Sequence, residues 1–258
     1  MVNSELKTDI SEDILRRFEK VSLQSCTGAL SYITNQAKAA KNGDTSSSWK
    51  NCYMKNVKPL THGRKIAARA RTLSFLPPRP DMAAALRRGE DSPEFEAMET
   101  CGPGDVLVVD ANRMSQLGIL GNMKTRRLWA RGATGLITDA SIRDVDKIRD
   151  DYGLAMFGAG RSAVTGLEGS PFHQVNVPIS CDGVLVVPGD VMVADDDGVV
   201  VIPQQLAEQV IDWIEEHDQV ENFIAELVDE QQCSPGRFYP PSEELRQRYR
   251  DEKAQKTK

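Results

Sequence analysis

One stretch of the sequence, residues 118–144, collects the residue types that a site for a small anion requires. Gly121 lets the backbone turn freely just before a predicted helix, and the free amides at the start of a helix hold carboxylate or phosphate groups. At the other end, Arg143 offers a planar cationic fork and Asp144 offers hard oxygen ligands for a divalent cation. The amides of the predicted cradle belong to Asn122, Met123 and Lys124. The pattern favours binding of a small anionic substrate.

The elements on either side of these residues must bring them together. Met123, Arg127, Leu128 and Ala130 recur at helical spacing and Gly132 is a stop signal, so a helix is predicted in the middle of this stretch. The apolar run TGLITD that follows is predicted to be a strand. Because consecutive elements usually lie side by side, the loop before the helix and the loop after the strand are expected to meet.

Asp144 also has a purely structural interpretation. It directly precedes VDKIRDD and would make an ordinary N-cap for a short helix, with Arg143 as its solvated neighbour. Helix caps are far more common than metal sites, so the local pattern alone favours the cap.

A resemblance changes this balance. Three blocks occur in order: GPGDVLVVDA, the stretch 121–144, and GVLVVPGDVMVADDDGVVVIP. Together they cover residues 100–203 and resemble the class II, metal-dependent pyruvate aldolases that act on 4-hydroxy-4-methyl-2-oxoglutarate and 4-carboxy-4-hydroxy-2-oxoadipate. That family includes the regulator of ribonuclease activity A, and its pattern is a glycine turn followed later by an Arg-Asp pair.

The resemblance implies an α/β fold, a layered β/β/α swivelling-type domain, assembled as a homotrimer or homohexamer with the site at a subunit interface. Asp144 would hold Mg²⁺ or Mn²⁺, Arg143 would stabilise oxyanion charge, and residues 121–124 would bind a carboxylate of the substrate. The implied reaction is retro-aldol cleavage of a 4-hydroxy-2-oxo acid to pyruvate, with decarboxylation of oxaloacetate as a side activity. A glutamate from a neighbouring subunit would approach the metal; its possible counterparts are Glu215, Glu216 and Glu221.

Three positions depart from the family pattern. Asn122 stands where well-characterised members carry an acid, and an amide cannot take a proton. Lys124 stands where many members carry an apolar residue. Lys147 stands where members carry an acidic residue, and the acidic Asp146 comes one position before it. Each change removes negative charge or adds positive charge, which indicates a more anionic substrate or a reaction without base-assisted cleavage.

Other functions stay open. Lys124 could form a Schiff base, although an exposed lysine is the more common case. The domain could be a hydro-lyase or decarboxylase of a sugar-derived 2-oxo acid, or a non-enzymatic, protein-binding regulator of ribonuclease activity.

Composition limits the partners. The chain has 258 residues and a net charge of −6, which disfavours nonspecific binding to nucleic acid and to anionic membranes. Its apolar runs are too short to span a bilayer, so a cytoplasmic protein is expected. Five scattered cysteines and three separated histidines indicate neither a disulfide framework nor a histidine metal centre, so a carboxylate-and-water site for Mg²⁺ or Mn²⁺ is the better match.

The remaining pattern predicts the order of the elements. Helices are expected over residues 11–21, behind a Ser11 cap, and around CTGALSYITNQA, followed by a polar loop over residues 40–50. A strand ending at Pro77 carries Arg69 and Arg71, which are interpreted as a solvated edge more often than as an anion clamp. The segment over 81–101 is expected to form a helix and connector.

Beyond the central stretch, the predicted loop after MFGAG supplies second-tier pocket candidates: Arg161, Ser162 and His173. Residues 175–203 read as strands with PGD and DDDG hairpin turns, and residues 204–230 as a long amphipathic helix. We therefore expect a single catalytic domain over 1–230 and a charged helical arm over 231–258.

Overall fold

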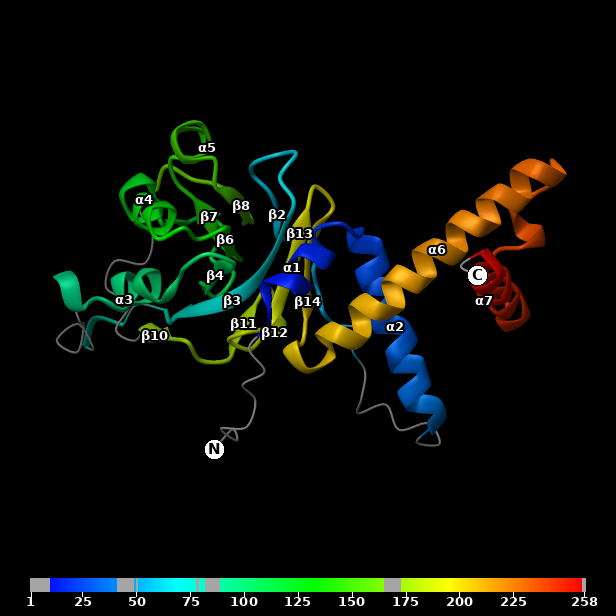
Figure 1. Cartoon of the computed structure of the whole chain (residues 1–258). Helices are drawn as coiled ribbons and strands as arrows, with labels where there is room; N and C mark the ends of the chain where they lie inside the picture. The colour runs from blue at the N-terminus through cyan, green and yellow to red at the C-terminus, as the bar shows by residue number, and fades with distance from the viewer. Residues whose placement is uncertain are drawn as a thin grey trace.

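The computed structural model describes residues 10–40, 49, 51–77, 79–81, 89–164 and 173–256, and Figure 1 shows their arrangement. Within these residues, nine strands form the main sheet. They are β1 (Tyr53–Met54), β2 (Lys58–Pro59), β3 (Ile66–Phe75), β4 (Asp105–Asp110), β6 (Gly135–Thr138), β8 (Ala155–Gly158), β10 (His173–Val175), β13 (Val191–Asp195) and β14 (Gly198–Ile202). Their order is β1-β14-β13-β3-β4-β6-β8-β2, with β10 paired to β3.

The centre of the sheet is parallel. Strands β3, β4, β6 and β8 run in the same direction, and the flanking strands join antiparallel. The sequences GLIT and AMFG of β6 and β8 are buried along their whole length. Such continuous apolar runs are typical of parallel strands covered on both faces.

Alternate side chains of the strands point into different cores. One set, with Val106, Val108 and Ile137, packs against the hairpin of β11 (Ile179–Cys181) and β12 (Val184–Val186). The other set points outward to the helices. Strands β1 and β2 lie at opposite ends of the strand order although only residues 55–57 separate them, so the sheet must curl until its edges approach.

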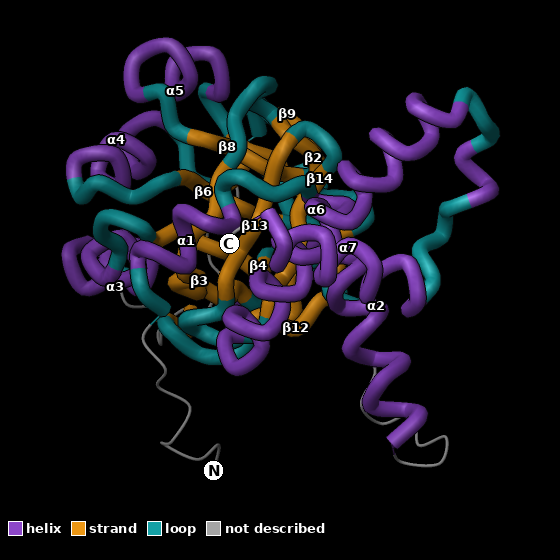
Figure 2. The backbone as a smooth tube through the Cα atoms, turned by 45° about the vertical axis from the view of Figure 1, so that its right-hand side comes forward, coloured by secondary structure: helices purple, strands orange, loops and turns teal. Residues whose placement is uncertain are grey.

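Two groups of helices cover the outer face of the curled sheet (Figures 1 and 2). One group contacts Leu107, Val109 and Leu136 and comprises α3 (Pro93–Thr100), α4 (Asn122–Ala130) and α5 (Val145–Tyr152). The other contacts Val191, Val193 and Val200 and comprises α1 (Glu12–Phe18), α2 (Leu23–Ala40) and the first half of α6 (Ala207–Gln231). The predicted layered α/β fold with N-terminal helices and a long C-terminal helix is confirmed.

The second half of α6 extends away from the sheet, and α7 (Glu243–Lys256) lies beside it (Figure 1). Short 3₁₀ turns precede α3, α6 and α7: η2 (Gly89–Asp91), η3 (Gln204–Leu206) and η4 (Pro235–Arg237). The helix predicted over 204–230 is therefore η3 plus α6. The boundary between a domain over 1–230 and an arm over 231–258 stays a prediction. None of the helices in the described part of the chain has the length and apolar character that crossing a bilayer requires.

Several local predictions are confirmed. The Ser11 hydroxyl accepts a hydrogen bond from the Ile14 amide at 3.3 Å and caps α1. Strand β3 ends before Pro77, and residues 195–198 form the turn of the β13–β14 hairpin. All five cysteines are free. Most of the polar loop predicted over 40–50 lies outside the described residues.

Other local predictions are wrong. Arg69 and Arg71 do not form a solvated edge, because β3 is an inner strand and both guanidinium groups bind the Asp105 carboxylate, at 2.9 and 3.1 Å. The Asp105 side chain is only 6% exposed, so the two arginines neutralise a buried charge. The PGD turn is not a hairpin, because β12 pairs with β11 whereas β13 pairs with β3 and β14.

Candidate functional site

A small parallel sheet gathers the loops of the site. Its strands are β5 (Gly118–Ile119), β7 (Ser141–Ile142) and β9 (Gly160–Arg161), in the order β5-β7-β9. Each follows one parallel strand of the main sheet, since β5 comes after β4, β7 after β6 and β9 after β8. The carboxyl ends of parallel strands meet at one edge of a sheet, where α/β proteins commonly bind ligands. The predicted meeting of the loops before α4 and after β6 is therefore observed.

Two glycines let these loops touch. A Cβ atom on Gly118 would lie 2.3 Å from Cγ of Arg143, and one on Gly121 would lie 2.7 Å from Oδ2 of Asp144. Neither space can hold a methyl group without displacing the Arg143-Asp144 pair. The glycines thus fix this pair against the start of α4.

The structure overturns the interpretation of Asp144 as an ordinary helix cap. The residue does precede α5, but it is left-handed, with φ 56° and ψ 30°, and its carboxylate makes no hydrogen bond to α5. Oδ2 instead accepts a hydrogen bond at 3.0 Å from the backbone amide of Asn122. A left-handed aspartate is uncommon and costs conformational energy, which indicates that the loop needs this geometry.

Several polar groups at this point lack a partner. Among the described residues, neither Oδ1 of Asp144 nor the half-buried guanidinium of Arg143 has a hydrogen bond or ion pair. The predicted cradle of three amides is smaller than expected: Asn122 donates to Asp144 and Lys124 donates to the Gly121 carbonyl at 3.1 Å. The amide of Met123 keeps its donor free within the described residues. One amide, one guanidinium and one carboxylate oxygen are thus available to a ligand.

The side chain of Asn122 is bound to the end of the neighbouring helix. The Tyr152 hydroxyl, on the last residue of α5, donates to Oδ1 of Asn122 at 2.6 Å. The Tyr152 ring stacks on Trp129 of α4, with centroids 5.5 Å apart. Spacing in the sequence gave no signal for Tyr152, because the contact depends on how α4 and α5 lie together.

The extra positive charges that the sequence pointed to are neutralised locally. Lys124 forms an ion pair with Glu94 of α3 at 2.6 Å, and Lys147 pairs with Asp151 one helical turn along α5. Whether the substrate is more anionic, or the reaction proceeds without base-assisted cleavage, stays a prediction. Glu94 was missed because it lies in a separate acidic segment whose placement only the tertiary fold decides.

The second-tier candidates separate into two cases. Arg161 lies in β9, paired with Ile142, and its guanidinium binds Asp146 at 2.8 Å. The Ser162 hydroxyl donates to the Gln116 carbonyl at 2.8 Å. Both therefore support the loops of the site. His173 is placed elsewhere, in β10 opposite Phe75, and its side chain lies outside the described residues.

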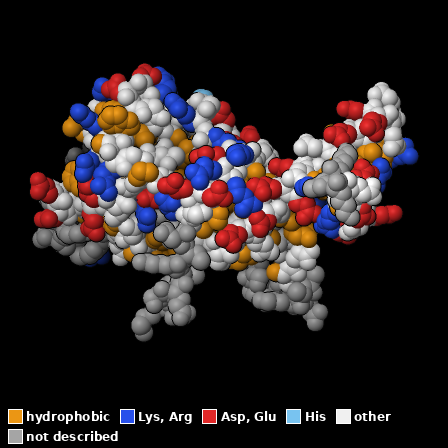
Figure 3. All heavy atoms as spheres, in the orientation of Figure 1, with side chains coloured by type: hydrophobic (Ala, Val, Ile, Leu, Met, Phe, Trp, Pro, Cys, Tyr) orange, Lys and Arg blue, Asp and Glu red, His pale blue; other side chains and the backbone are white. Residues whose placement is uncertain are grey.

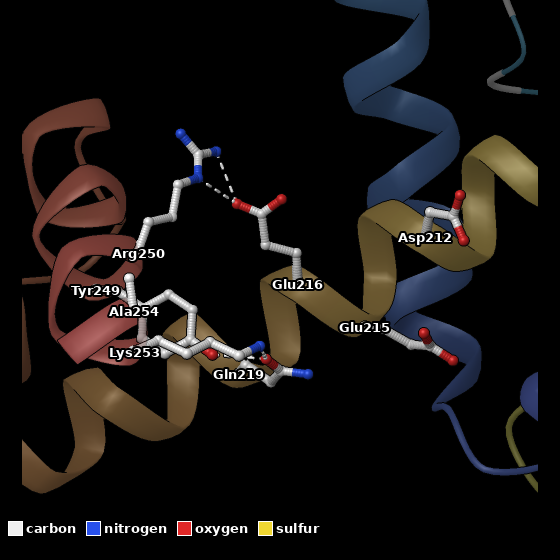
Figure 4. Close-up of a pocket in the computed structure, with 8 residues that line it drawn as sticks. All are labelled: Asp212, Glu215, Glu216, Gln219, Tyr249, Arg250, Lys253 and Ala254. Carbon is white, nitrogen blue, oxygen red and sulfur yellow. Dashed lines mark hydrogen bonds and ion pairs between the residues drawn. The ribbon is translucent and has the colours of Figure 1, made fainter. Parts of the chain in front are cut away.

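The three candidate glutamates of α6 have partners in their own chain. Glu215 binds Arg17 of α1 at 2.8 Å, and this ion pair lowers the pKa of the carboxyl. Glu216 binds Arg250 at 2.7 Å and Glu221 lies 3.2 Å from His217. Two of them line a cavity of about 520 Å³ between α6 and α7, which Figure 4 shows at close range. Whether a neighbouring subunit uses one of them stays a prediction.

A second group of carboxylates lies at the ends of β4 and β6 but is fully used by the fold. The buried Asp139 accepts hydrogen bonds from the amides of Ala111, Arg113 and Asp182. Burial, with the charge of Asp110 nearby, raises the pKa of Asp139. This group holds loops together rather than presenting free oxygens.

A hard cation fits the site only if a bound substrate supplies further ligands beside Asp144. Asp144 keeps one carboxylate oxygen without a partner among the described residues, and in the same ranges no group of three or more His, Cys, Asp or Glu side chains is placed to bind a metal. Mg²⁺ commonly keeps several waters and binds through one or two carboxylates plus substrate oxygens. Asp144 therefore suits Mg²⁺ or Mn²⁺ bound together with a chelating substrate.

The surface beside the site is partly apolar. Met123 is 73% exposed, and Trp129 is 49% exposed. Figure 3 shows an apolar group bordered by lysine and arginine over the part of the surface where α4 and α5 lie. Buried Thr125 and Leu128 form the inner side of α4 instead.

The fold and the glycine turn with its Arg-Asp pair define a known class. The chain belongs to the RraA-like family, described as Aldolase/RraA, whose sequence pattern matches residues 40–201. The resemblance seen in the sequence is thereby confirmed.

Relatives include a protein of Thermus thermophilus named 4-hydroxy-4-methyl-2-oxoglutarate aldolase, 31% identical over 112 residues, which are 42% of this chain and 65% of that protein. A Halalkalibacterium halodurans protein that carries the same name provisionally is 30% identical over 155 residues, 60% of this chain and 68% of its own length. The matched region thus spans about two thirds of each relative.

Solved structures agree on the fold. Streptomyces coelicolor RraAS2, described as an unusual member of the RNase ES inhibitor RraA protein family, is 30% identical with a TM-score of 0.66, covering 84% of this chain and 98% of that one. An uncharacterized protein of Pseudomonas syringae pv. tomato has a TM-score of 0.69 at 22% identity, covering 92% of this chain and 96% of its own, and supports the fold alone.

Proposed function

We propose that the protein is a divalent-metal-dependent lyase that cleaves a 4-hydroxy-2-oxo acid to pyruvate and a second carbonyl compound. The observation that carries this proposal is the pair Arg143-Asp144, held against the glycine turn with the guanidinium of Arg143 and Oδ1 of Asp144 lacking partners among the described residues. An arginine and a carboxylate held side by side with open polar atoms can bind an anion and a hard cation together. The aldolase names of the relatives point to the same chemistry.

The proposed reaction balances without an added redox partner. The proton of the 4-hydroxyl group passes to a water molecule, C4 becomes a carbonyl carbon, and the C3–C4 bond breaks with its electron pair moving to C3. The resulting enolate of pyruvate then takes a proton at C3. Loss of CO₂ from oxaloacetate produces the same enolate, which supports decarboxylation as a side activity.

Each available group has a role in this scheme. Arg143 binds the oxygen on which negative charge grows, and the free amide of Met123 binds a substrate carboxylate. Asp144 would hold Mg²⁺ or Mn²⁺, which when bound supplies electrophilic stabilisation of the enolate charge. Asn122 cannot accept the 4-hydroxyl proton, because an amide is not a base at neutral pH.

We also propose a cytoplasmic homotrimer or homohexamer with the site at a subunit interface. Five free cysteines are usual in a reducing compartment. The exposed Met123 and Trp129 beside the site support contact with another subunit.

The test is pyruvate release from 4-hydroxy-4-methyl-2-oxoglutarate and from oxaloacetate, each with Mg²⁺ and with EDTA. We expect turnover only with the metal, and a loss of at least about a hundredfold in Asp144→Ala. Asp150→Ala is the matched control, because Asp150 is an exposed carboxylate of the same helix that contacts only Arg149. Equal activity of both variants would contradict the role of Asp144.

A protein-binding regulator is the second candidate, favoured by the similarity to RraAS2 over most of both chains. Under that proposal no metal-dependent turnover is found with either substrate. Dehydration or decarboxylation of a sugar-derived 2-oxo acid is distinguished by the product formed.

A further inference from the structure

The amide of Asn122 has a defined orientation. The Tyr152 hydroxyl approaches it at 2.6 Å, a distance usual for an O–H···O hydrogen bond and short for one that involves an amide nitrogen. A phenol that donates to Oδ1 therefore fixes which end of the amide faces the tyrosine. Because Oδ1 is used, the two N–H groups on Nδ2 remain as donors.

Residue 122 is held at two of its atoms. Its backbone amide donates to Oδ2 of Asp144 at 3.0 Å, while its side-chain oxygen is bound by Tyr152. The tyrosine ring is itself stacked on Trp129 with an interplanar angle of 30°. Nδ2 of Asn122 has no acceptor among the residues that the structure describes. A half-buried donor group with a fixed partner on one side is prepared for an acceptor on the other.

We propose that Tyr152 is a positioning residue that fixes Asn122 as a hydrogen-bond donor to an acceptor oxygen of the substrate. The substrates selected are 2-oxo acids that carry a carbonyl or carboxylate oxygen at this position, and residue 122 carries no proton during turnover. The inference rests on the proposed function, since it concerns the same site.

Electrostatics favour an amide over an acid here. The backbone of residue 122 touches the Asp144 carboxylate, so an aspartate at this position would place a second negative charge near the first. An anionic ligand would then meet repulsion where Asn122 offers donors.

The experiment measures oxalate binding by calorimetry in the presence of Mg²⁺, because oxalate has the shape and charge of the pyruvate enolate. Tyr152→Phe removes the hydroxyl and keeps the ring on Trp129. We expect oxalate to bind roughly fivefold more weakly, the usual effect of losing one hydrogen bond. Tyr32→Phe is the matched control, because Tyr32 also stacks on a tryptophan, Trp213, and within the described residues its hydroxyl bonds to Gln36 alone.

Two further variants separate positioning from a general structural role. In an Asn122→Ala background, Tyr152→Phe should cause no further loss of oxalate binding, because the hydroxyl acts through the amide. Asn122→Asp should bind oxalate more weakly at neutral pH, because it adds a negative charge beside Asp144. Asn122→Ala alone should reproduce the loss if Tyr152→Phe does not fold.

The outcomes are distinguishable. If the wild-type protein binds oxalate but Tyr152→Phe binds it equally well, or loses affinity equally in the Asn122→Ala background, the inference is wrong and the proposed function stands. If the wild-type protein neither binds oxalate with Mg²⁺ nor releases pyruvate, the proposed function is wrong and the inference falls with it.

Discussion

Two regions of the molecule concentrate charged side chains in concave surroundings, and they use them differently. Between α6 and α7 the cavity is about 520 Å³, yet its charges are matched. Arg250 binds Glu216 (Figure 4), and Asp212 and Glu215 bind Arg17 of α1. At the start of α4 there is no comparable matching, since Arg143 and one oxygen of Asp144 lack partners among the described residues. The start of α4, rather than the larger cavity, is thus the place where charged groups are left without partners among the described residues.

The backbone also differs between the two regions. The α6–α7 pairs sit on regular helices, where exposed ion pairs contribute little to stability. The α4–α5 loops contain left-handed Leu120 and Asp144, with φ of 47° and 56°, and two glycines that admit no side chain. Strain of this kind persists only where the surrounding structure enforces it.

The largest expected effect comes from filling the space beside Arg143. In Gly118→Ala the new Cβ would lie 2.3 Å from Arg143 Cγ and 2.8 Å from the Ser162 carbonyl oxygen, so Arg143 must move. We expect kcat/KM for pyruvate release to fall by about a hundredfold. Gly28→Ala in α2 is the control, because its Cβ would meet the Trp213 ring at an ordinary 4.0 Å. Unchanged activity in Gly118→Ala would show that Arg143 has no role in the reaction.

The loop before β13 carries a buried carboxyl, Asp190, whose contribution to stability should depend on pH. Asp190 accepts hydrogen bonds from Val187 and Gln204, and burial raises its pKa to about 6. A carboxyl with a raised pKa stabilises the fold most at low pH and loses this contribution as the pH rises through about 6.

The stability of the wild type relative to Asp190→Asn should therefore fall by about 2 kcal/mol between pH 4.5 and 7.5, measured by urea unfolding. A difference that is constant with pH would show that Asp190 does not titrate in this range.

Lys124 tests whether a paired cation near the site behaves like those between α6 and α7. Its ammonium group is bound to Glu94, and nucleophilic attack would require that contact to be given up. Borohydride with pyruvate should add no mass to the protein, and Lys124→Met should change kcat/KM by roughly threefold at most. Trapping of pyruvate on Lys124 would support a Schiff-base aldolase instead.

The smallest effect is expected between α6 and α7. Arg250→Gln breaks exposed pairs with Glu216 and Glu243. The free energy of unfolding should change by about 0.5 kcal/mol or less, and pyruvate release should be unchanged. A tenfold loss of activity would place the C-terminal arm in the working site, as an interface between subunits would require.

The sequence by itself determined the local elements and the family. Apolar periodicity, the Ser11 cap and Gly132 located helices and strands because these signals act over a few residues. The glycine turn and the Arg-Asp pair were likewise readable, since each is a short block of fixed residue types.

Tertiary structure decided what those residues do. Asp144 looked like a helix cap, but its carboxylate bonds to Asn122, 22 positions earlier. The residues of the pairs Lys124–Glu94 and Tyr152–Asn122 are each 30 positions apart in the sequence, and those of the pair Arg69–Asp105 are 36 positions apart. Pairings at such distances depend on how α3, α4, α5 and the parallel strands pack, and hydrophobic burial fixes that packing without regard to which polar groups it brings together.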